Sequence, residues 1–355
     1  MTLRVLAINP GSTSTKIGVF DDETQILDKT LRHSTEEIAS YPSIYAQKDF
    51  RKDLILAALA EDNIPLESIN VVVGRGGLLK PIPGGTYPVS DALLKDLINP
   101  PQGEHASNLG GILAREIGDQ LHVHSYIVDP VVVDELEPVA RISGVPEIER
   151  VSIFHALNQK AMARKYAKQV NKKYEDLNLI VVHMGGGVSV GAHKDGKVID
   201  VFNALDGDGA FSPERAGGVP SGALIRMCFH SGLSEAEIRR KIVGNGGFNA
   251  YIGTNSAQTL AKMADSGDEK AALVREAFIY QLSKNVGAMA AVLKGKVDAI
   301  ILTGGIAHDK YVTEKISEYV SFIAPVVIYP GEDELLALVQ GALRVENGEE
   351  EAKNY

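Results

Sequence analysis

The sequence predicts an α/β protein of two duplicated domains with a ligand cleft between them, and three observations support this prediction. Residues 5–30 and 179–202 share one pattern: an apolar strand, a glycine-containing turn, a second strand, an acidic turn and a third strand. Asn9 falls opposite His183, 174 residues later, an offset close to half of the 355-residue chain. Segments with helical spacing of apolar residues separate the later strands in both halves. Because open α/β sheets bind ligands at strand ends, the glycine-rich ends of both halves are expected to line the cleft.

The later strands repeat as well. Residues 69–77 (INVVVGRGG) resemble 299–307 (AIILTGGIA), and 125–130 (SYIVDP) resemble 326–332 (VVIYPGE). Their continuous apolar runs are typical of parallel strands buried on both faces. Apolar residues at helical spacing predict helices over the segments 50–61, 92–97, 110–121, 157–170, 235–243, 273–293 and 335–345.

The expected domain boundary lies near ISGVPEIE (142–149), which combines glycine, proline and acidic residues. This gives an N-terminal domain over 1–148 and a C-terminal domain over 149–333. A helix over about 334–355 is expected to pack back on the first domain, while the polar ending ENGEEEAKNY is expected to fray.

Composition excludes several classes of function. The net charge of −10, from 46 acidic and 36 basic residues, argues against a nucleic-acid partner. The single cysteine, Cys228, cannot form an internal disulfide or a four-cysteine metal site. No apolar run reaches 18 residues, and the N-terminus enters a strand without a signal-peptide pattern. We therefore expect a cytoplasmic protein with no membrane partner.

The stretch VLAINPGSTSTKIGVF (5–20) has four consecutive hydroxyl residues between two strands. Gly11 and Lys16 suggest a P-loop, but that motif requires a glycine before the lysine and a helix after it. Thr15 occupies the glycine position, and a β-branched strand follows. What remains is a hairpin turn rich in hydrogen-bond donors, which either holds an anion or is an ordinary polar turn. A Rossmann dehydrogenase is a poor interpretation, because GRGGLL, GGGVSV and GNGGFN all lack the last glycine of GxGxxG.

Two hairpin turns of this kind and a TGGI strand end resemble the superfamily of acetate and sugar kinases, chaperones and actin. The resemblance implies two ribonuclease-H-like domains of the actin-like ATPase type, with the nucleotide in the cleft between them. Within this superfamily, NPGSTSTK, VGRGG, HASNLGG, IVDP, FHALNQ, HMGGGVSVG and TGGI follow the order of the acetate kinase family over nearly the whole chain.

This resemblance implies a reversible phosphotransferase that uses ATP and Mg²⁺. The expected acceptor is the carboxylate of butyrate, or of a similar short or branched-chain fatty acid, and the products are an acyl phosphate and ADP. An ionised carboxylate needs no general base, so a site rich in arginine, histidine and metal is expected. Acetate or propionate is the alternative acceptor, and a non-enzymatic ATPase or a sugar kinase is a weaker alternative. Family members also imply a homodimer or larger homo-oligomer.

The resemblance gives catalytic roles to four residues. Arg75 is implied to grip the substrate carboxylate or phosphate, and His155 to contact the transferring phosphoryl group. Asp129 is implied to orient Arg75 or an Mg²⁺-bound water. The family's arginine in G-T-R-S/C-G is replaced here by Pro220, so we expect Arg215 to supply that charge. The competing interpretations are that Arg75 is a surface arginine, that His155 is structural, and that Asp129 is a turn residue.

The binding residues are also implied by the resemblance. The N-terminal domain would bind the acyl substrate and the transferring phosphoryl group through Asn9, Ser12, Ser14, Lys16 and, at the acyl end, His105. The C-terminal domain would bind the nucleotide through His183, Gly185, Gly186, Gly187, Asn255, Gly304, Gly305 and Ile306. The metal would be held by Asn9 and by Asp333 or Glu334, of which the gap-free alignment favours Asp333. His122 and His124 are expected to be surface residues without a metal-binding partner.

Overall fold

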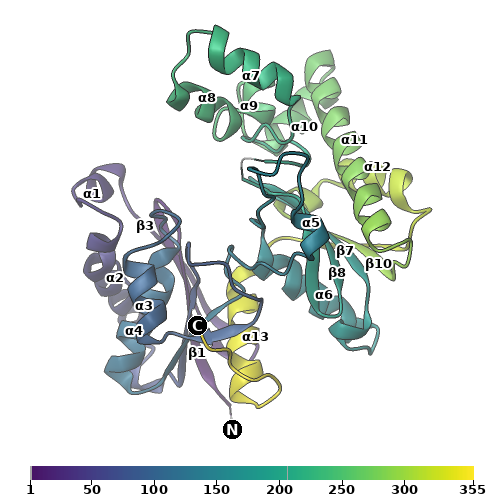
Figure 1. Ribbon diagram of the computed structural model, residues 1–355. Helices are drawn as coiled ribbons and strands as arrows, with labels where there is room; N and C mark the ends of the chain where they lie inside the picture. Colours follow the sequence, from purple (N-terminus) through teal and green to yellow (C-terminus); the bar gives the residue numbers. More distant parts are fainter. Residues whose placement is uncertain (1, 206) are drawn as a thin grey trace. The chain divides into compact units, whose positions relative to one another are not determined.

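The computed structural model describes residues 2–205 and 207–355, and Figure 1 shows its course. The chain forms two compact units, one of residues up to Val133 together with Asp333–Tyr355, the other of Asp134–Glu332. The first unit thus ends earlier than the boundary expected after residue 148. Residues 134–148 belong to the second unit instead. Glu137 N donates to Ile199 O at 2.9 Å, and the nearby Arg150 forms an ion pair of 2.9 Å with Asp200.

The first unit contains a six-stranded sheet in the order β3-β2-β1-β4-β6-β5. The three N-terminal strands are antiparallel neighbours, β1, β4 and β6 are parallel, and β5 runs antiparallel to β6. The strand bounds are β1 Arg4–Pro10, β2 Ser14–Asp21, β3 Thr24–Arg32, β4 Val71–Arg75, β5 Thr86–Pro88 and β6 His124–Val128.

Helices cover both faces of this sheet (Figure 1). On β6, Ile127 faces Gly111 of α4, whereas the next residue, Val128, faces Gly341 of α13. Successive residues of a strand point to opposite faces, so α4 and α13 lie on opposite sides of the sheet. The helix bounds are α1 Thr35–Ala39, η1 Tyr45–Gln47, α2 Lys48–Glu61, η2 Leu66–Ser68, α3 Asp91–Ile98, α4 Asn108–Leu121 and α13 Glu334–Glu346.

The C-terminal tail is bound to the first unit, so the expectation of a frayed ending was wrong. Helix α13 ends at Glu346, short of the expected 355, and the chain continues without helical structure. Lys353 N donates to Thr86 O at 2.9 Å, and the Tyr355 hydroxyl donates to Asp96 Oδ2 at 2.8 Å. The polar composition of the ending does not predict these contacts, because they are made by the backbone N–H of Lys353 and the phenol of Tyr355.

The second unit repeats the strand order of the first. Its sheet runs β11-β10-β7-β8-β9, with β7, β8 and β9 antiparallel and β7, β10 and β11 parallel. This matches β6-β4-β1-β2-β3 strand for strand, which confirms the predicted duplication. The bounds are β7 Leu179–Met184, β8 Val188–Lys194, β9 Lys197–Val201, β10 Ala299–Gly304 and β11 Val326–Pro330.

Alternation along β8 separates an apolar face from a polar one. Val190 packs in a core with Phe278 and Leu282 of α11, whereas the neighbouring Ser189 and Gly191 face Gln159 of α6. The helix bounds of this unit are α5 Pro138–Arg141, α6 Ala156–Gln169, η3 Tyr174–Asp176, α7 Ser221–His230, α8 Glu235–Ile242, α9 Gly247–Ile252, α10 Ala257–Asp265, α11 Glu269–Val292, η4 Gly305–His308 and α12 Lys310–Val320.

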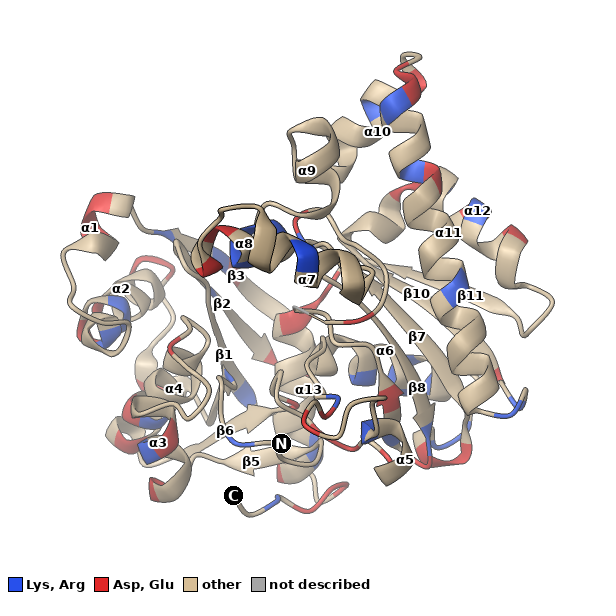
Figure 2. Cartoon of the chain, turned by 45° about the horizontal axis from the view of Figure 1, so that its top comes forward, with Lys and Arg blue, Asp and Glu red and all other residues tan. Residues whose placement is uncertain are grey.

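The long helices α2, α4, α6 and α11 agree with the sequence prediction, whereas α7, α9, α10 and α12 were not predicted. Helix α7 buries none of its residues, so its apolar side chains follow no core-facing stripe. Figure 2 shows acidic and basic residues side by side on α8, where Arg239 and Glu235 form an ion pair of 2.7 Å. Over residues 2–205 and 207–355, no helix has the length and apolar character needed to cross a membrane.

Candidate functional site

The first unit brings together three residues that are far apart in the sequence. Asn9 lies near the end of β1, Arg75 is the last residue of β4, and Glu334 is the first residue of α13. Glu334 Oε2 accepts from Arg75 Nη1 at 2.8 Å and from Asn9 Nδ2 at 2.6 Å. Arg75 Nη1 also lies 3.3 Å from Asn9 Oδ1. We call these three residues the Arg75 cluster.

The glycines around Arg75 explain its position. Gly74 of β4 lies so close to the backbone of Gly110 in α4 that a Cβ on either residue would overlap the other segment. Asn108, the first residue of α4, accepts a hydrogen bond from Leu78 N at 2.8 Å through its side-chain oxygen. The VGRGG and HASNLGG motifs therefore form one packed unit, which fixes the backbone on both sides of Arg75.

The turn Gly11–Thr15, which we call the hydroxyl turn, lies over a buried arginine that the sequence analysis missed. Arg51 of α2 is 1% exposed. Its Nη1 donates to Gly11 O at 2.8 Å and to Ser14 O at 3.0 Å, and its Nη2 donates to Ser12 O at 3.3 Å. Burial lowers the pKa of Arg51 to about 10, so the side chain stays charged at neutral pH.

Within the hydroxyl turn, the hydroxyl residues differ in exposure. Ser12 is exposed and Ser14 is half-buried, whereas Thr15 is buried and its Oγ1 lies 2.9 Å from His33 Nε2. Lys16 was expected at the phosphoryl group, but in this structure its Nζ pairs with Asp28 of β3 at 3.2 Å. Ser12 and Ser14 therefore remain candidates for a ligand contact, while Lys16 needs a change of rotamer to reach one.

Asp129 and His105 are held by local contacts. Asp129 follows β6, is 1% exposed, and accepts from Gly85 N at 2.7 Å through Oδ1. Its backbone φ of 38° is in the left-handed region, which aspartate tolerates better than most residues. His105 is exposed before α4, with its Nδ1 2.8 Å from Ser107 Oγ. The hydrogen bond from Gly85 N supports a role for Asp129 in shaping the turn at Gly85.

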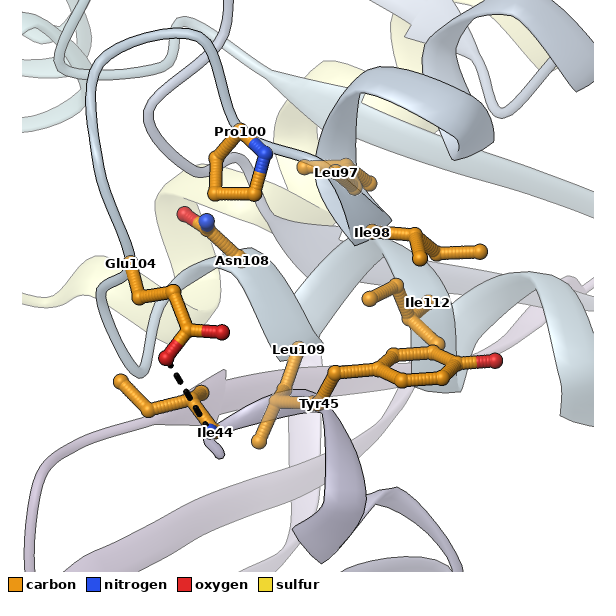
Figure 3. Close-up of a pocket in the computed structure, with 9 residues that line it drawn as sticks. All are labelled: Ile44, Tyr45, Leu97, Ile98, Pro100, Glu104, Asn108, Leu109 and Ile112. Carbon is orange, nitrogen blue, oxygen red and sulfur yellow. Dashed lines mark hydrogen bonds between the residues drawn. The ribbon is translucent and has the colours of Figure 1, made fainter. Parts of the chain in front are cut away.

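A small pocket adjoins this region, between η1, α3 and α4 (Figure 3). Its interior of about 10 Å³ has room for roughly one water molecule. In this structure the pocket is therefore too small for a four-carbon acyl chain. It is lined by Ile44, Tyr45, Leu97, Ile98, Pro100, Glu104, Asn108, Leu109 and Ile112.

The second unit forms a matching turn of three glycines, Gly185–Gly187, between β7 and β8. We call it the glycine turn. Gly186 has open space where a Cβ would stand, and its carbonyl accepts from Ser212 Oγ at 3.0 Å. At Gly187 a side chain would collide with the guanidinium of Arg215. A larger residue at Gly187 would displace the Arg215 guanidinium, and the open space at Gly186 leaves the backbone of the turn accessible to a ligand.

Two histidines stack beside the glycine turn. The rings of His155 and His183 have centroids 3.8 Å apart and an interplanar angle of 13°. His155 Nδ1 lies 2.8 Å from Ser189 Oγ, and His183 Nδ1 lies 2.8 Å from Asn158 Oδ1. Glu332, which the sequence analysis did not select, has its Oε1 3.6 Å from His183 Nε2.

Arg215 belongs to this group of residues. Its Nη1 donates to Ala204 O at 2.6 Å, and a Cβ on Gly187 would touch both Arg215 and, at 3.2 Å, His155 Cε1. Pro220, which replaces the family arginine, precedes α7 and contributes no charge. The geometry thus brings Arg215, His155 and the glycine turn together, as the substitution hypothesis requires.

The TGGI strand end lies next to the glycine turn. Gly304 has φ of 91° and passes so close to Met184 that a Cβ would overlap its backbone. Gly305 has open space around it, whereas the Ile306 side chain is 7% exposed and packs in the core. Any ligand contact of Ile306 must therefore use its backbone. Asn255 is exposed, with its Nδ2 3.4 Å from Glu214 Oε2.

The oxygen ligands of the Arg75 cluster fit a magnesium ion. Mg²⁺ is commonly held by one or two carboxylates together with waters and substrate phosphates. Glu334 supplies a carboxylate and Asn9 an amide oxygen at the same point. Asp333, which the alignment favoured, is exposed and precedes α13 with φ of 39°. In the described ranges, no three His, Cys, Asp or Glu side chains are grouped to hold a metal by themselves.

Sequence patterns could have pointed to only some of the missed residues. Asn158 belongs to the FHALNQ motif and Ser189 to HMGGGVSVG, so both stood within motifs already recognised. Glu332 precedes Asp333 in EDEL and was passed over for its neighbours. Arg51 gave no signal, because a lone arginine in a helical pattern is normally a surface residue.

Comparisons with known proteins show what this chain is similar to. Residues 147–324 match the Acetokinase family. Butyrate kinase 2 of Clostridium acetobutylicum is 61% identical over 355 residues, which are 100% of each chain. Butyrate kinase 1 of the same organism is 61% identical over 352 residues, or 99% of each chain. The crystal structure of Porphyromonas gingivalis acetate kinase has a TM-score of 0.78 at 19% identity, covering 96% of this chain and 99% of that one, and confirms the fold class.

Proposed function

The chain belongs to the acetokinase family, and on that premise we propose that it transfers the γ-phosphoryl group of ATP reversibly to the carboxylate of butyrate. The products are butyryl phosphate and ADP. The identity of 61% to two butyrate kinases over at least 99% of this chain supports butyrate as the acceptor. Acetate and propionate are the alternative acceptors, as the names of its structural neighbours suggest.

The observation that carries this proposal is the Arg75 cluster. A guanidinium, an amide and a carboxylate from three distant segments meet at the carboxyl ends of β1 and β4. Ligands of α/β sheets bind at such ends. Arg75 has the planar donor geometry that pairs with a carboxylate or a phosphate. We assign the acceptor carboxylate to Arg75 for this reason.

The chemistry requires neutralisation of charge rather than proton transfer. A carboxylate oxygen forms the new bond to the γ-phosphorus, the bond to the bridging β,γ oxygen breaks, and its electron pair leaves with ADP. In the in-line transition state, negative charge spreads over three equatorial oxygens. Arg75 offsets the charge of the acceptor, while Arg215 and His155 donate hydrogen bonds to phosphoryl oxygens. Backbone amides of the hydroxyl turn and the glycine turn add further donors.

Magnesium fits the donors of the Arg75 cluster, and Glu334 with Asn9 would hold it. When bound, it would neutralise charge on the phosphate oxygens and align them for transfer. Glu334 would contact the metal while it also orients the Arg75 guanidinium through their 2.8 Å ion pair. Nucleotide binding is assigned to the glycine turn and to Gly304 and Gly305. A cytoplasmic location and a homo-oligomeric state stay predictions from the family.

The test is acyl phosphate formation with MgATP, trapped as the hydroxamate by hydroxylamine. The panel of acceptors is acetate, propionate, butyrate, isobutyrate and valerate. We expect kcat/KM to be highest at four carbons. A maximum at acetate would replace butyrate as the substrate but keep the reaction. Absence of product with every acid, from protein that still binds ATP, would overturn the proposed function.

A further inference from the structure

A buried chain of hydrogen bonds runs from Tyr174 to His155 inside the second unit. The Tyr174 hydroxyl lies 2.7 Å from His193 Nδ1, and His193 Nε2 lies 2.9 Å from Gln159 Oε1. Gln159 Nε2 donates to Ser189 Oγ at 2.8 Å, and Ser189 Oγ lies 2.8 Å from His155 Nδ1. All four residues behind His155 are at most 4% exposed, so water does not compete for these bonds.

The side-chain amide of Gln159 determines which groups donate and which accept along this series of hydrogen bonds. Its Nε2 lies 3.2 Å from the backbone carbonyl oxygen of Ser189, which can only accept a hydrogen bond. The nitrogen therefore faces Ser189, and the oxygen faces His193. Because that oxygen can only accept, the proton of His193 must be on Nε2.

His193 is held in its neutral form. Burial, together with the positive charges of Lys160 and Arg164, lowers the pKa of His193 well below its ordinary value. Lys160 is itself paired with Glu135 at 2.9 Å, and its Nζ lies 5.8 Å from the centroid of the Tyr174 ring. Neutral His193 has a lone pair on Nδ1, which accepts the proton of the Tyr174 hydroxyl.

The hydrogen bonds of Ser189 determine the tautomer of His155 in the same way. Ser189 Oγ accepts from Gln159 Nε2, and the His155 backbone N–H also points to it at 3.4 Å. Because both of these nitrogens donate, the Ser189 hydroxyl directs its own proton to His155 Nδ1 at 2.8 Å. Ser189 thus donates to Nδ1, and the proton of neutral His155 is left on Nε2.

We propose that Ser189 and Gln159, backed by His193, are positioning residues that hold neutral His155 as its Nε2–H tautomer. His155 then presents a hydrogen-bond donor to a phosphoryl oxygen, as a reaction without a general base requires. The catalytic half of this inference depends on the proposed function, whereas the tautomer does not.

The stacked partner, His183, has a proton on the other nitrogen, Nδ1. Asn158 Nδ2 donates to the carbonyl oxygen of Glu332 at 3.1 Å, so Asn158 Oδ1 faces His183 Nδ1. His183 must therefore carry its proton on Nδ1. The pair of rings offers an internal comparison, because His155 and His183 should give different nitrogen signals in one spectrum.

The decisive experiment is long-range ¹H–¹⁵N NMR of the full chain labelled at histidine, with signals assigned from His155→Gln and His183→Gln variants. We expect a protonated Nε2 and a bare Nδ1 at His155, and a protonated Nδ1 at His183. A protonated Nδ1 at His155 would overturn the proposal. In Ser189→Ala the His155 signals should shift toward a mixture of tautomers, and unchanged signals would also contradict it.

Kinetics test the positioning role. Ser189→Ala removes the hydroxyl that bonds His155 Nδ1 and Gln159 Nε2, and should lower kcat about tenfold with little change in KM for ATP. Ser283→Ala is the matched control, because Ser283 is a buried serine of the same unit that bonds Ile279 O at 2.8 Å. It should leave kcat unchanged, and thermal unfolding of both variants reports any loss of folding. An unchanged kcat in Ser189→Ala would overturn the positioning role, while an inactive wild type with the expected tautomers would overturn the proposed function instead.

Discussion

Arg51 Nη1 donates to the carbonyl oxygen of Gly11 at 2.8 Å, although Arg51 lies on a helix behind the hairpin. In a planar trans peptide unit the carbonyl and the following N–H point in opposite directions. Because the carbonyls of Gly11 and Ser12 point toward Arg51, the N–H groups of Ser12 and Thr13 point away from it. The buried cation thus orders the hydroxyl turn with its donors outward, as an anion site needs.

We predict that Arg51→Lys weakens both stability and phosphate binding. A lysine ammonium cannot span the carbonyls of Gly11, Ser12 and Ser14, so buried acceptors lose their partners. The free energy of unfolding should fall by about 3 kcal/mol, and KM for butyryl phosphate should rise at least about fivefold. Urea denaturation and steady-state kinetics measure the two effects. Arg32→Lys, at an exposed position, is the control, and equal values for the two variants would disprove the role of Arg51.

The sequence predicted the duplicated sheet because its signals are local and repeated. The hairpin 5–30 and its copy 179–202 carry the same order of apolar runs and turns, and each run became a strand. Arg75 and Asn9 could be selected because each ends a strand in a recognisable motif. Arg51 could not be selected, because its role depends on hydrogen bonds to three backbone carbonyls of the hydroxyl turn. These carbonyls come near Arg51 only when α2 packs against the turn.

Sequence alignment was also limited in choosing between Asp333 and Glu334 as the metal ligand. The two residues are adjacent and chemically alike, and a gap-free alignment favoured Asp333. Asp333 has a left-handed φ of 39° and precedes α13, and the side chain of the next residue, Glu334, bonds Asn9 and Arg75. These contacts favour Glu334 over Asp333 as the proposed metal ligand, a preference that residue spacing alone did not provide.

We predict that Glu334→Gln is far more harmful than Asp333→Asn. Both changes remove one charge at constant size, and asparagine tolerates the left-handed backbone at 333. Loss of the Glu334 carboxylate removes the partner of Arg75 and a proposed ligand of Mg²⁺. We expect kcat/KM to fall about a hundredfold or more and the Mg²⁺ concentration for half-maximal activity to rise. Comparable effects of the two substitutions in a magnesium titration would remove Glu334 from the metal site.

Arg215→Ala should lower kcat by about a thousandfold, because arginines that stabilise the phosphoryl-transfer state contribute on that scale. Its guanidinium lies against Gly187 and near His155, where such a charge is needed. Arg226→Ala, at an exposed residue of α7, is the matched control. A loss smaller than tenfold, in protein of normal thermal stability, would show that Arg215 does not replace the family arginine.

We predict that the free energy of unfolding declines as the pH falls from about 7 to 5, because folding lowers the pKa of His33 and of His193. Burial and the charge of Arg51 lower the pKa of His33, and burial lowers the pKa of His193 well below its ordinary value. Near pH 6.5 and below, the unfolded chain therefore binds more protons at both residues than the folded chain does. The stabilisation is therefore complete above about pH 6.5 and is lost below it, by up to about 1.4 kcal/mol per pH unit for each histidine. Carboxylates with lowered pKa values act only below about pH 4.5, so their effect is separate. Urea denaturation at several pH values in this range gives the free energy of unfolding as a function of pH. Its slope should be shallower for His33→Gln than for the exposed control His230→Gln. Equal slopes for the two variants would contradict the assignment to His33.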